Sequence, residues 1–301
     1  MGISQRFADV VKPHVGVQVR SRVVRSRFAA RGPSAGMRML PDFLVIGAMR
    51  GGTSSLYKYL SQHPDVAPSL RKEIDYFSRH YDRGERWYRQ HFALRTRRQL
   101  AEIRGRQLLT FEATPYYLFD PRCPARAQAL LPSARQVVLL RDPVERAFSD
   151  YQHMCRLGFE DLSFAAALDA EPRRLAPELA RMAEDPGYFS RAHHHFSYFS
   201  RGLYAEQLER WLAVYPTSSL LLVESKDLYD DPAQCVTTVL DFLGLRRWAP
   251  ARFRNYSYVG APPQRSKVDQ GLQRELRTRY AVDDRRLAEM WGRIPSWRAG
   301  G

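Results

Sequence analysis

Short apolar runs that lack alternation recur along the chain, and each is followed by a turn and a helical pattern. Four such runs lie at residues 43–47, 107–111, 136–140 and 220–223. Continuous runs of this length are typical of strands that are buried on both faces of a parallel sheet. Their alternation with helices predicts an α/β fold with a single doubly wound parallel sheet flanked by helices, whose ligands bind beyond the carboxyl ends of the strands.

The turn after the first run has the composition of a phosphate-binding loop. Gly51 and Gly52 allow close backbone approach, and apolar residues at helical spacing follow, so the loop leads into a helix N-terminus that favours an anion. The spacing is that of the nucleotide-binding P-loop, except that Thr53 stands where the lysine for the β- and γ-phosphates belongs. We expect a P-loop-like nucleotide-binding core with one phosphate at this end; the alternative is a tight strand-to-helix turn without a ligand.

Composition bounds the class of protein. The 301 residues suit one α/β domain with basic ends, and 47 Lys and Arg against 32 Asp and Glu give a net charge of +15. Such a charge indicates an anionic partner but does not choose among a nucleotide, an acidic glycan, nucleic acid and a membrane surface. The cysteines at 123, 155 and 235 lie far apart, which argues against a disulfide framework and a zinc site.

The first 40 residues form a basic N-terminal extension, and we place the main domain at 41–301. The extension carries eight Lys and Arg against the single acid Asp9, with valines between them. Such an arm suits an anionic membrane or a partner protein, although the composition favours a poorly ordered extension. The sequence shows no apolar stretch for a membrane span or signal peptide, which predicts a cytoplasmic protein with at most a peripheral membrane contact.

Candidate charged residues fall at the predicted strand ends. Arg50, Glu112 and Arg141 each follow an apolar run, and Ser149 lies eight residues beyond Arg141 in a helical segment. Glu73 stands between a basic pair and an aromatic pair, where it suits a general base; the alternative is a solvated surface glutamate.

The segment 188–204 is dense in aromatic residues and contains three adjacent histidines, 193–195. Adjacent residues of a regular element cannot all face one ion, and no carboxylate pattern lies nearby. We therefore expect a loop or lid over the site, and no metal requirement.

Two separated motifs, the loop at 47–55 and VVLLRDPVERAFSDYQH at 137–153, together resemble the signature segments of the PAPS-dependent sulfotransferases. The chain is most similar to the Golgi heparan sulfate, or carbohydrate, type and its bacterial relatives. Further matching segments are HPDVAPSLRKEIDYFS, YDRGERWY, FEATPYYLF, RGLYAEQLERWLAVYP and LLLVESKDLYDDPAQCVTTVLDFLGL. The resemblance runs in order over residues 41–297.

The resemblance implies PAPS as the co-substrate and PAP as the product, and it implies roles for matching residues. The 5′-phosphosulfate would contact Arg50, Gly51, Gly52, Thr53, Ser54 and Ser55. The 3′-phosphate side would contain Arg141, Ser149 and Tyr204, Glu73 would be the catalytic base assisted by Arg50, and the acceptor side would contain Asp75, Trp87 and Tyr116. The chain departs from many heparan-type relatives at Ala113, Asp75 and Ser54, which stand where lysine, histidine and arginine occur.

We therefore expect a sulfotransferase that moves a sulfuryl group from PAPS to an acceptor hydroxyl of a glycan, glycolipid or small metabolite by in-line displacement. The alternatives are a P-loop-like kinase, which the missing lysine disfavours, and a non-catalytic binder of anionic membrane or nucleic acid. The second alternative explains the charge but not two spaced phosphate motifs, so we expect no nucleic-acid partner.

Overall fold

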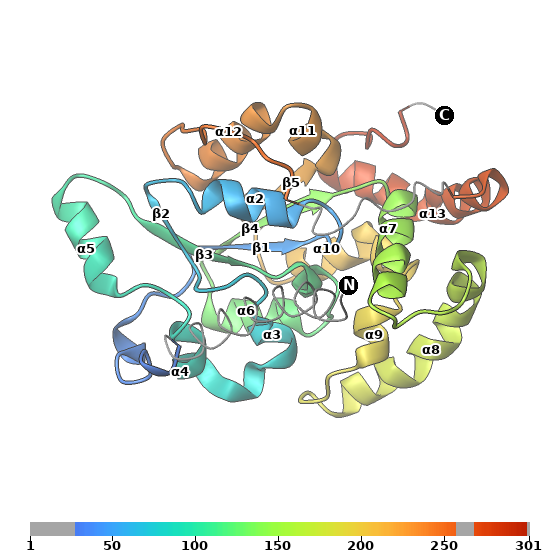
Figure 1. The fold of residues 1–301 in the computed structure, drawn as a ribbon, viewed down its shortest axis with the longest axis horizontal. Coiled ribbons are helices and arrows are strands. Elements are labelled where there is room, and N and C mark those ends of the chain that lie inside the picture. The colour runs from blue at the N-terminus through green and yellow to red at the C-terminus, as the bar shows by residue number, and fades with distance from the viewer. Residues whose placement is uncertain (1–27, 257–267, 300–301) are drawn as a thin grey trace, which may run out of the picture.

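The computed structural model describes residues 28–256 and 268–299 of the chain (Figure 1). Most of the basic N-terminal extension, and with it the predicted membrane contact, lies outside the described residues. The domain boundary at residue 40 stays a prediction.

One parallel sheet of five strands forms the centre of the molecule. The strands are β1 (Phe43–Gly47), β2 (Val66–Pro68), β3 (Leu109–Ala113), β4 (Arg135–Leu140) and β5 (Leu220–Glu224). Their order is β2-β3-β1-β4-β5, and every neighbouring pair is parallel. The chain therefore winds outward in both directions from β1, which confirms the predicted doubly wound sheet. β2 was not predicted, because three residues are too few to form a recognisable apolar run.

Helices connect the strands and cover the sheet. In chain order they are α2 (Thr53–Leu60), α3 (Tyr76–Arg79), α4 (Gly84–Arg89), α5 (Arg95–Ile103), α6 (Cys123–Leu130), α7 (Pro143–Arg156), α8 (Phe164–Glu184), α9 (Arg191–His195), α10 (Tyr204–Leu212), α11 (Ser225–Asp230), α12 (Pro232–Leu243) and α13 (Gln270–Trp291). Short 3₁₀ segments lie at Ala35–Met37, Tyr81–Arg83, Pro115–Leu118, Ser200–Gly202 and Thr217–Ser219. Figure 1 shows α2 and α12 on one face of the sheet and α6 on the other.

Both faces of the sheet are buried, which explains the apolar runs without alternation. In β1, Leu44 and Ile46 pack in a cluster with residues of α6 and α10, whereas Phe43 and Val45 pack in a second cluster with residues of α2 and α12. All five residues of β1 are buried. A third cluster joins α7, α8 and α13 beside the sheet and supports α7, which carries Ser149.

Candidate active site

The loop between β1 and α2 requires its two glycines. A Cβ atom on Gly51 would lie 2.7 Å from the carbonyl oxygen of Leu139 in β4 and 2.9 Å from that of Ala48, both of them backbone atoms. Gly52 has φ of 95°, a left-handed conformation that side chains disfavour. The loop therefore packs so closely against the end of β4 that no side chain fits at Gly51. Helix α2 starts directly after the loop.

The N-terminus of α2 is shaped for an anion. Its N-cap residue is Gly52, so no side chain caps the first turn, and the turn contains no acidic residue. The backbone N–H groups of a first helical turn and the positive end of the helix dipole favour a negative charge there. Ser54 is half-buried at this end, whereas Thr53 is buried.

The second motif converges on this loop. The Asp142 side chain accepts hydrogen bonds from Val144 N (2.9 Å) and Glu145 N (3.4 Å), and Pro143 opens the helix, so α7 starts immediately after β4. Within α7, Ser149 Oγ accepts a hydrogen bond of 3.1 Å from Nε of Arg50, which lies 99 positions earlier in the chain.

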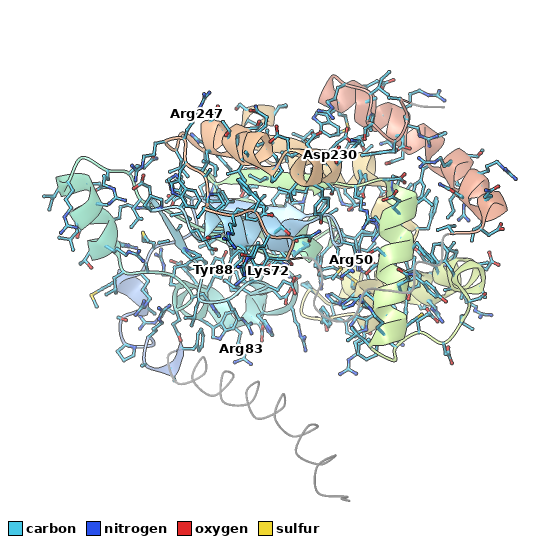
Figure 2. All side chains as sticks on the ribbon, turned by 45° about the horizontal axis from the view of Figure 1, so that its top comes forward. Arg50, Lys72, Arg83, Tyr88, Asp230 and Arg247 are labelled. Atoms are coloured by element: carbon cyan, nitrogen blue, oxygen red, sulfur yellow. The ribbon has the colours of Figure 1, made fainter. Side chains whose placement is uncertain are left out.

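Arg141 completes the cluster from the end of β4. Its Nη1 lies 3.4 Å from the backbone oxygen of Arg50, and its Nη2 forms an ion pair of 3.0 Å with Glu145. This ion pair is mostly exposed, with 60% of the Glu145 side chain accessible, so it contributes at most about 1 kcal/mol. Arg141 can therefore exchange Glu145 for a phosphate at little cost. Figure 2 shows Arg50 beside α7.

Three candidate residues share a left-handed backbone. Arg50, Glu73 and Asp75 have φ of 67°, 57° and 58°, and no other non-glycine residue of the described chain has a positive φ. This conformation costs an ordinary side chain roughly 1–2 kcal/mol and concentrates at functional sites. Backbone strain thus coincides with the residues that the sequence motifs singled out.

The segment with Glu73 and Asp75 is fixed to the end of β3. Glu73 N donates a hydrogen bond of 2.9 Å to the Ala113 oxygen, and the Glu73 carboxylate pairs with Lys72 while half of its side chain stays exposed. Burial and, as a smaller contribution, the negative charge of Glu73 raise the pKa of Asp75 to about 6. The site therefore holds one accessible carboxylate and one that titrates near neutrality.

A cavity of about 90 Å³ joins the loop to these carboxylates. It is lined by Met49, Glu73, Asp75, Arg79, Thr114, Pro115, Tyr116, Phe189 and His194. Met49 comes from the phosphate loop and His194 from α9, so α9 forms one wall of the site. The position fits the predicted element over the site, although the histidines lie in a short helix rather than a loop.

Two histidines of α9, His193 and the cavity-lining His194, are uncharged at neutral pH. The Tyr116 hydroxyl lies 2.6 Å from Nδ1 of His193, and burial lowers the pKa of His193 and of His194 to about 3. Across the described ranges, no group of three or more His, Cys, Asp or Glu side chains is arranged to hold a metal ion.

Three residues that were predicted to contact ligands are buried or lie away from the cavity. Tyr204 is fully buried, and its hydroxyl donates a hydrogen bond of 2.9 Å to the backbone oxygen of Arg141. It therefore holds the Arg141 backbone, and no part of its side chain is accessible to a ligand. Ser55 is buried as well, and its hydroxyl accepts a hydrogen bond from Tyr256 N (3.0 Å). Trp87 does not line the cavity; it packs in an aromatic cluster with Tyr76, His80 and His91.

Glu112 was expected to follow a strand at 107–111, but it is the penultimate residue of β3 and points into the core. Its carboxylate accepts hydrogen bonds from the hydroxyls of Tyr88, Thr114 (2.9 Å) and Tyr117 (3.1 Å), and it is fully buried. Burial raises its pKa to about 7. Figure 2 labels Tyr88, which approaches it from α4.

Sequence reasoning missed a buried charge network behind the site. Asp150, next to Ser149, accepts hydrogen bonds from Arg146 (3.1 Å) and Arg201 (2.9 Å). Arg201 also donates to the backbone oxygen of His194 (2.8 Å), and it contacts the Met49 sulfur. One buried arginine thereby links α7, the phosphate loop and the α9 wall. In the sequence, Arg201 is marked only by its place in the RGLY segment, which matches the family.

These features define a class: an α/β protein with a lysine-free glycine loop after β1, an arginine after β4 and a serine of α7 that both contact this loop, and an adjacent carboxylate-bearing cavity. A sulfotransferase domain model matches residues 40–256, and the chain belongs to the sulfotransferase family. It is therefore an enzyme of this family, as the two motifs indicated, and the family implies PAPS as co-substrate.

Individual relatives agree with this assignment. Mouse heparan sulfate glucosamine 3-O-sulfotransferase 6 is 34% identical over 240 residues, which are 80% of this chain and 61% of the relative. A solved structure of a sulfotransferase from Alicyclobacillus acidocaldarius superposes with a TM-score of 0.62 at 30% identity, covering 86% of this chain and 98% of that one. The chain thus spans about three fifths of the mouse relative and nearly all of the bacterial one.

The comparisons correct the predicted location. A membrane-associated sulfotransferase of Dictyostelium discoideum is 26% identical over 294 residues, covering 76% of this chain and 61% of the relative. This relative, which is named as membrane-associated, and the heparan sulfate sulfotransferases contradict the predicted cytoplasmic location. No helix in the part of the chain that the structure describes has the length and apolar character of a membrane span.

Proposed function

We propose that this chain transfers a sulfuryl group from PAPS to a hydroxyl group of a glycan. The observation that carries the proposal is the hydrogen bond between Arg50 and Ser149, which joins the two phosphate motifs directly beside the cavity with Glu73 and Asp75. The family supports sulfuryl transfer, and the named substrate of the mouse relative, heparan sulfate, supports a glycan acceptor.

The charged residues fit the two phosphate positions of PAPS. The uncapped N-terminus of α2, together with Arg50, suits the 5′-phosphate of PAPS. PAPS has a single phosphate at this end, without the β- and γ-phosphates that a P-loop lysine would contact. Arg141 and Ser149, supplied by β4 and α7, suit the separate 3′-phosphate. Tyr204 would act on this second position only by holding the Arg141 backbone.

The residues of the cavity supply the acid–base part of the reaction. PAPS supplies the sulfuryl group, which passes to the acceptor oxygen as the sulfur–oxygen bond to the 5′-phosphate breaks. Glu73 accepts the proton of the acceptor hydroxyl, because its carboxylate is the accessible one at the cavity. Arg50 and the first-turn N–H groups stabilise the negative charge left on the phosphate oxygen.

Cations around the cavity favour an acidic acceptor. Arg71, Lys72 and Arg79 all act electrostatically on Asp75, and Arg79 lines the cavity itself. Positive charge in a cleft raises the local concentration of an anionic substrate. An acidic glycan therefore suits this surface better than a neutral small metabolite.

The transfer is tested directly by following PAP formation from PAPS with a panel of acidic and neutral glycans. We expect turnover with an acidic glycan in the presence of a chelator. PAP should raise the melting temperature at micromolar concentration without Mg²⁺, by binding the folded state, whereas ATP should raise it weakly. Equal stabilisation by ATP with Mg²⁺, without any PAP formation, would favour the kinase alternative.

Arg141→Ala should weaken PAP binding by one to two decades, since an arginine–phosphate contact is typically worth about 1.5–3 kcal/mol. Adenosine 5′-phosphosulfate, which lacks the 3′-phosphate, should lose little affinity. Calorimetric titration of both nucleotides into wild type and variant measures the difference. Glu145→Gln is the matched control, because it breaks the same ion pair but keeps the arginine, and it should retain or improve PAP binding. Equal losses for both nucleotides would remove Arg141 from the 3′-phosphate site.

A further inference from the structure

Helix α5 lies at the edge of the fold and contacts the core through the partly buried Ala101. None of its nine residues is buried, and Figure 1 shows it beyond the end of the sheet opposite to the loop between β1 and α2. Surface helices of globular proteins normally bury one face, so a helix that buries no residue needs another explanation.

The outward face of α5 is apolar at two adjacent positions. Leu100 is 55% exposed and Ile103 is 81% exposed, the highest value among the exposed large hydrophobic residues. They lie three residues apart and therefore side by side on the helix surface. Together they form a small exposed apolar patch on this face of α5.

Arginines flank this apolar pair. No side chain of residues 28–256 or 268–299 forms a hydrogen bond or ion pair with the side chains of Arg95, Arg97 and Arg104, and all three are exposed. Within the segment 95–106 the single acid is Glu102. The helix therefore presents three free positive charges next to two apolar side chains.

Two other arginines hold α5 in this orientation. Arg98 pairs with Asp42 and donates to the Leu108 oxygen (3.1 Å), and Arg106 donates to Asp65 through Nε (2.8 Å). The apolar pair is consequently directed outward by a fixed helix, and its exposure does not follow from a loose attachment.

A groove of about 600 Å³ lies beside the helix, at the amino ends of β1, β3 and β4. Four of its lining residues are Arg89, Arg95, Arg98 and Arg135, against one acid, Asp42. The groove continues the positive surface of α5 toward the sheet.

We propose that α5 docks on an anionic membrane surface, with Leu100 and Ile103 inserted at the level of the headgroups and Arg95, Arg97 and Arg104 facing anionic lipids. Amphipathic basic helices bind membranes in this way through apolar burial plus electrostatic attraction. Two apolar side chains are too few for a stable protein interface, which needs about 800 Å² from each partner. A soluble polyanion would use the arginines but would gain nothing from the leucine and isoleucine.

Docking through α5 also sets the orientation of the enzyme. The phosphate loop and the cavity lie at the carboxyl ends of the strands, whereas α5 and the groove lie at the other end (Figure 1). The active site then faces away from the bilayer and stays open to a large acceptor. This inference is independent of the proposed transfer reaction, because it concerns a different end of the sheet.

The test is vesicle flotation of the full-length chain without PAPS or acceptor, with phosphatidylcholine vesicles that contain about 30% phosphatidylserine or none. We expect wild type to float only with the anionic vesicles and less so at high salt. Leu100→Gln with Ile103→Gln should weaken binding at least about tenfold through lost apolar burial. Arg97→Gln with Arg104→Gln should weaken it roughly fivefold for each arginine.

Val282→Gln with Arg285→Gln is the matched control, since it removes an exposed apolar residue and an exposed arginine from α13. This control should bind as wild type does, and all variants should keep the wild-type melting temperature because the altered residues are exposed. Three results would overturn the proposal. They are no binding of wild type to anionic vesicles, unchanged binding of both α5 variants, and loss in the arginine variant alone, which would indicate a soluble polyanion.

Discussion

Glu73→Gln is expected to lower turnover by roughly a hundredfold or more and to leave PAP affinity nearly unchanged. Glu73 lines the cavity, and among the described residues its ionic partner is the neighbouring Lys72, so its side chain does not hold the loop between β1 and α2, Arg141 or Ser149. Glutamine keeps the size of the side chain but cannot accept a proton. Single-turnover rates with saturating PAPS, together with calorimetric titration of PAP, separate the two effects.

The second carboxylate of the cavity provides the decisive comparison. Because the pKa of Asp75 is raised to about 6, its carboxylate gains a proton as the pH falls through this value. If Asp75 were the base, activity would fall below about pH 6, Asp75→Asn would cost more than Glu73→Gln, and the Glu73 variant would stay active. Glu85→Gln, an exposed glutamate paired with Arg89, is the control that should leave turnover unchanged.

Arg50→Ala is expected to lower the rate of the chemical step by about 10²–10³-fold, the usual effect of removing one group that stabilises charge developing in the transition state. Arg50 lies in the loop between β1 and α2 and contacts Ser149 of the second motif, so its guanidinium would lie between the two proposed phosphate positions. Burial lowers the pKa of Arg50, yet arginine stays protonated at neutral pH. The positive charge is therefore present where the leaving oxygen would form.

Arg50→Lys sharpens this experiment because it keeps the charge and gives up the planar hydrogen-bonding geometry. We expect an intermediate rate for the lysine variant and a wild-type rate for Arg83→Ala, which changes an exposed arginine outside the cavity. A loss of PAP affinity with an unchanged single-turnover rate would contradict the role in the chemical step and leave Arg50 as an anchor only.

Apolar patterning was sufficient for the sheet wherever a strand is buried on both faces. β1 and β4 pack on both sides against helices and therefore read as continuous apolar runs. β2 has three residues and is held at the sheet edge by its pairing with β3, which no local pattern records. Helix α8 was not recognised either, since Pro172 and Pro177 inside it oppose the helical pattern.

The site was predictable where motif spacing and local geometry act together. Gly51, Gly52 and the immediate start of α7 at Pro143 follow from local backbone requirements, and they bring Arg50 and Ser149 together. Contacts that depend on the third dimension were not predictable. The hydrogen bond from Tyr204 to the Arg141 backbone and the one from Arg201 to Asp150 could not be predicted. Such pairs have no characteristic spacing in the sequence.

The left-handed backbone at Arg50, Glu73 and Asp75 has an evolutionary consequence. Glycine tolerates this conformation better than arginine, glutamate or aspartate do, so a population selected for heat resistance alone would accumulate glycine at these positions. A population selected for activity would retain the charged residues despite the strain. Deep mutational scanning under the two regimes should therefore rank the native residue and its replacement in opposite order at each of these three positions. Such a reversal would identify residues that are retained for function at a cost in stability.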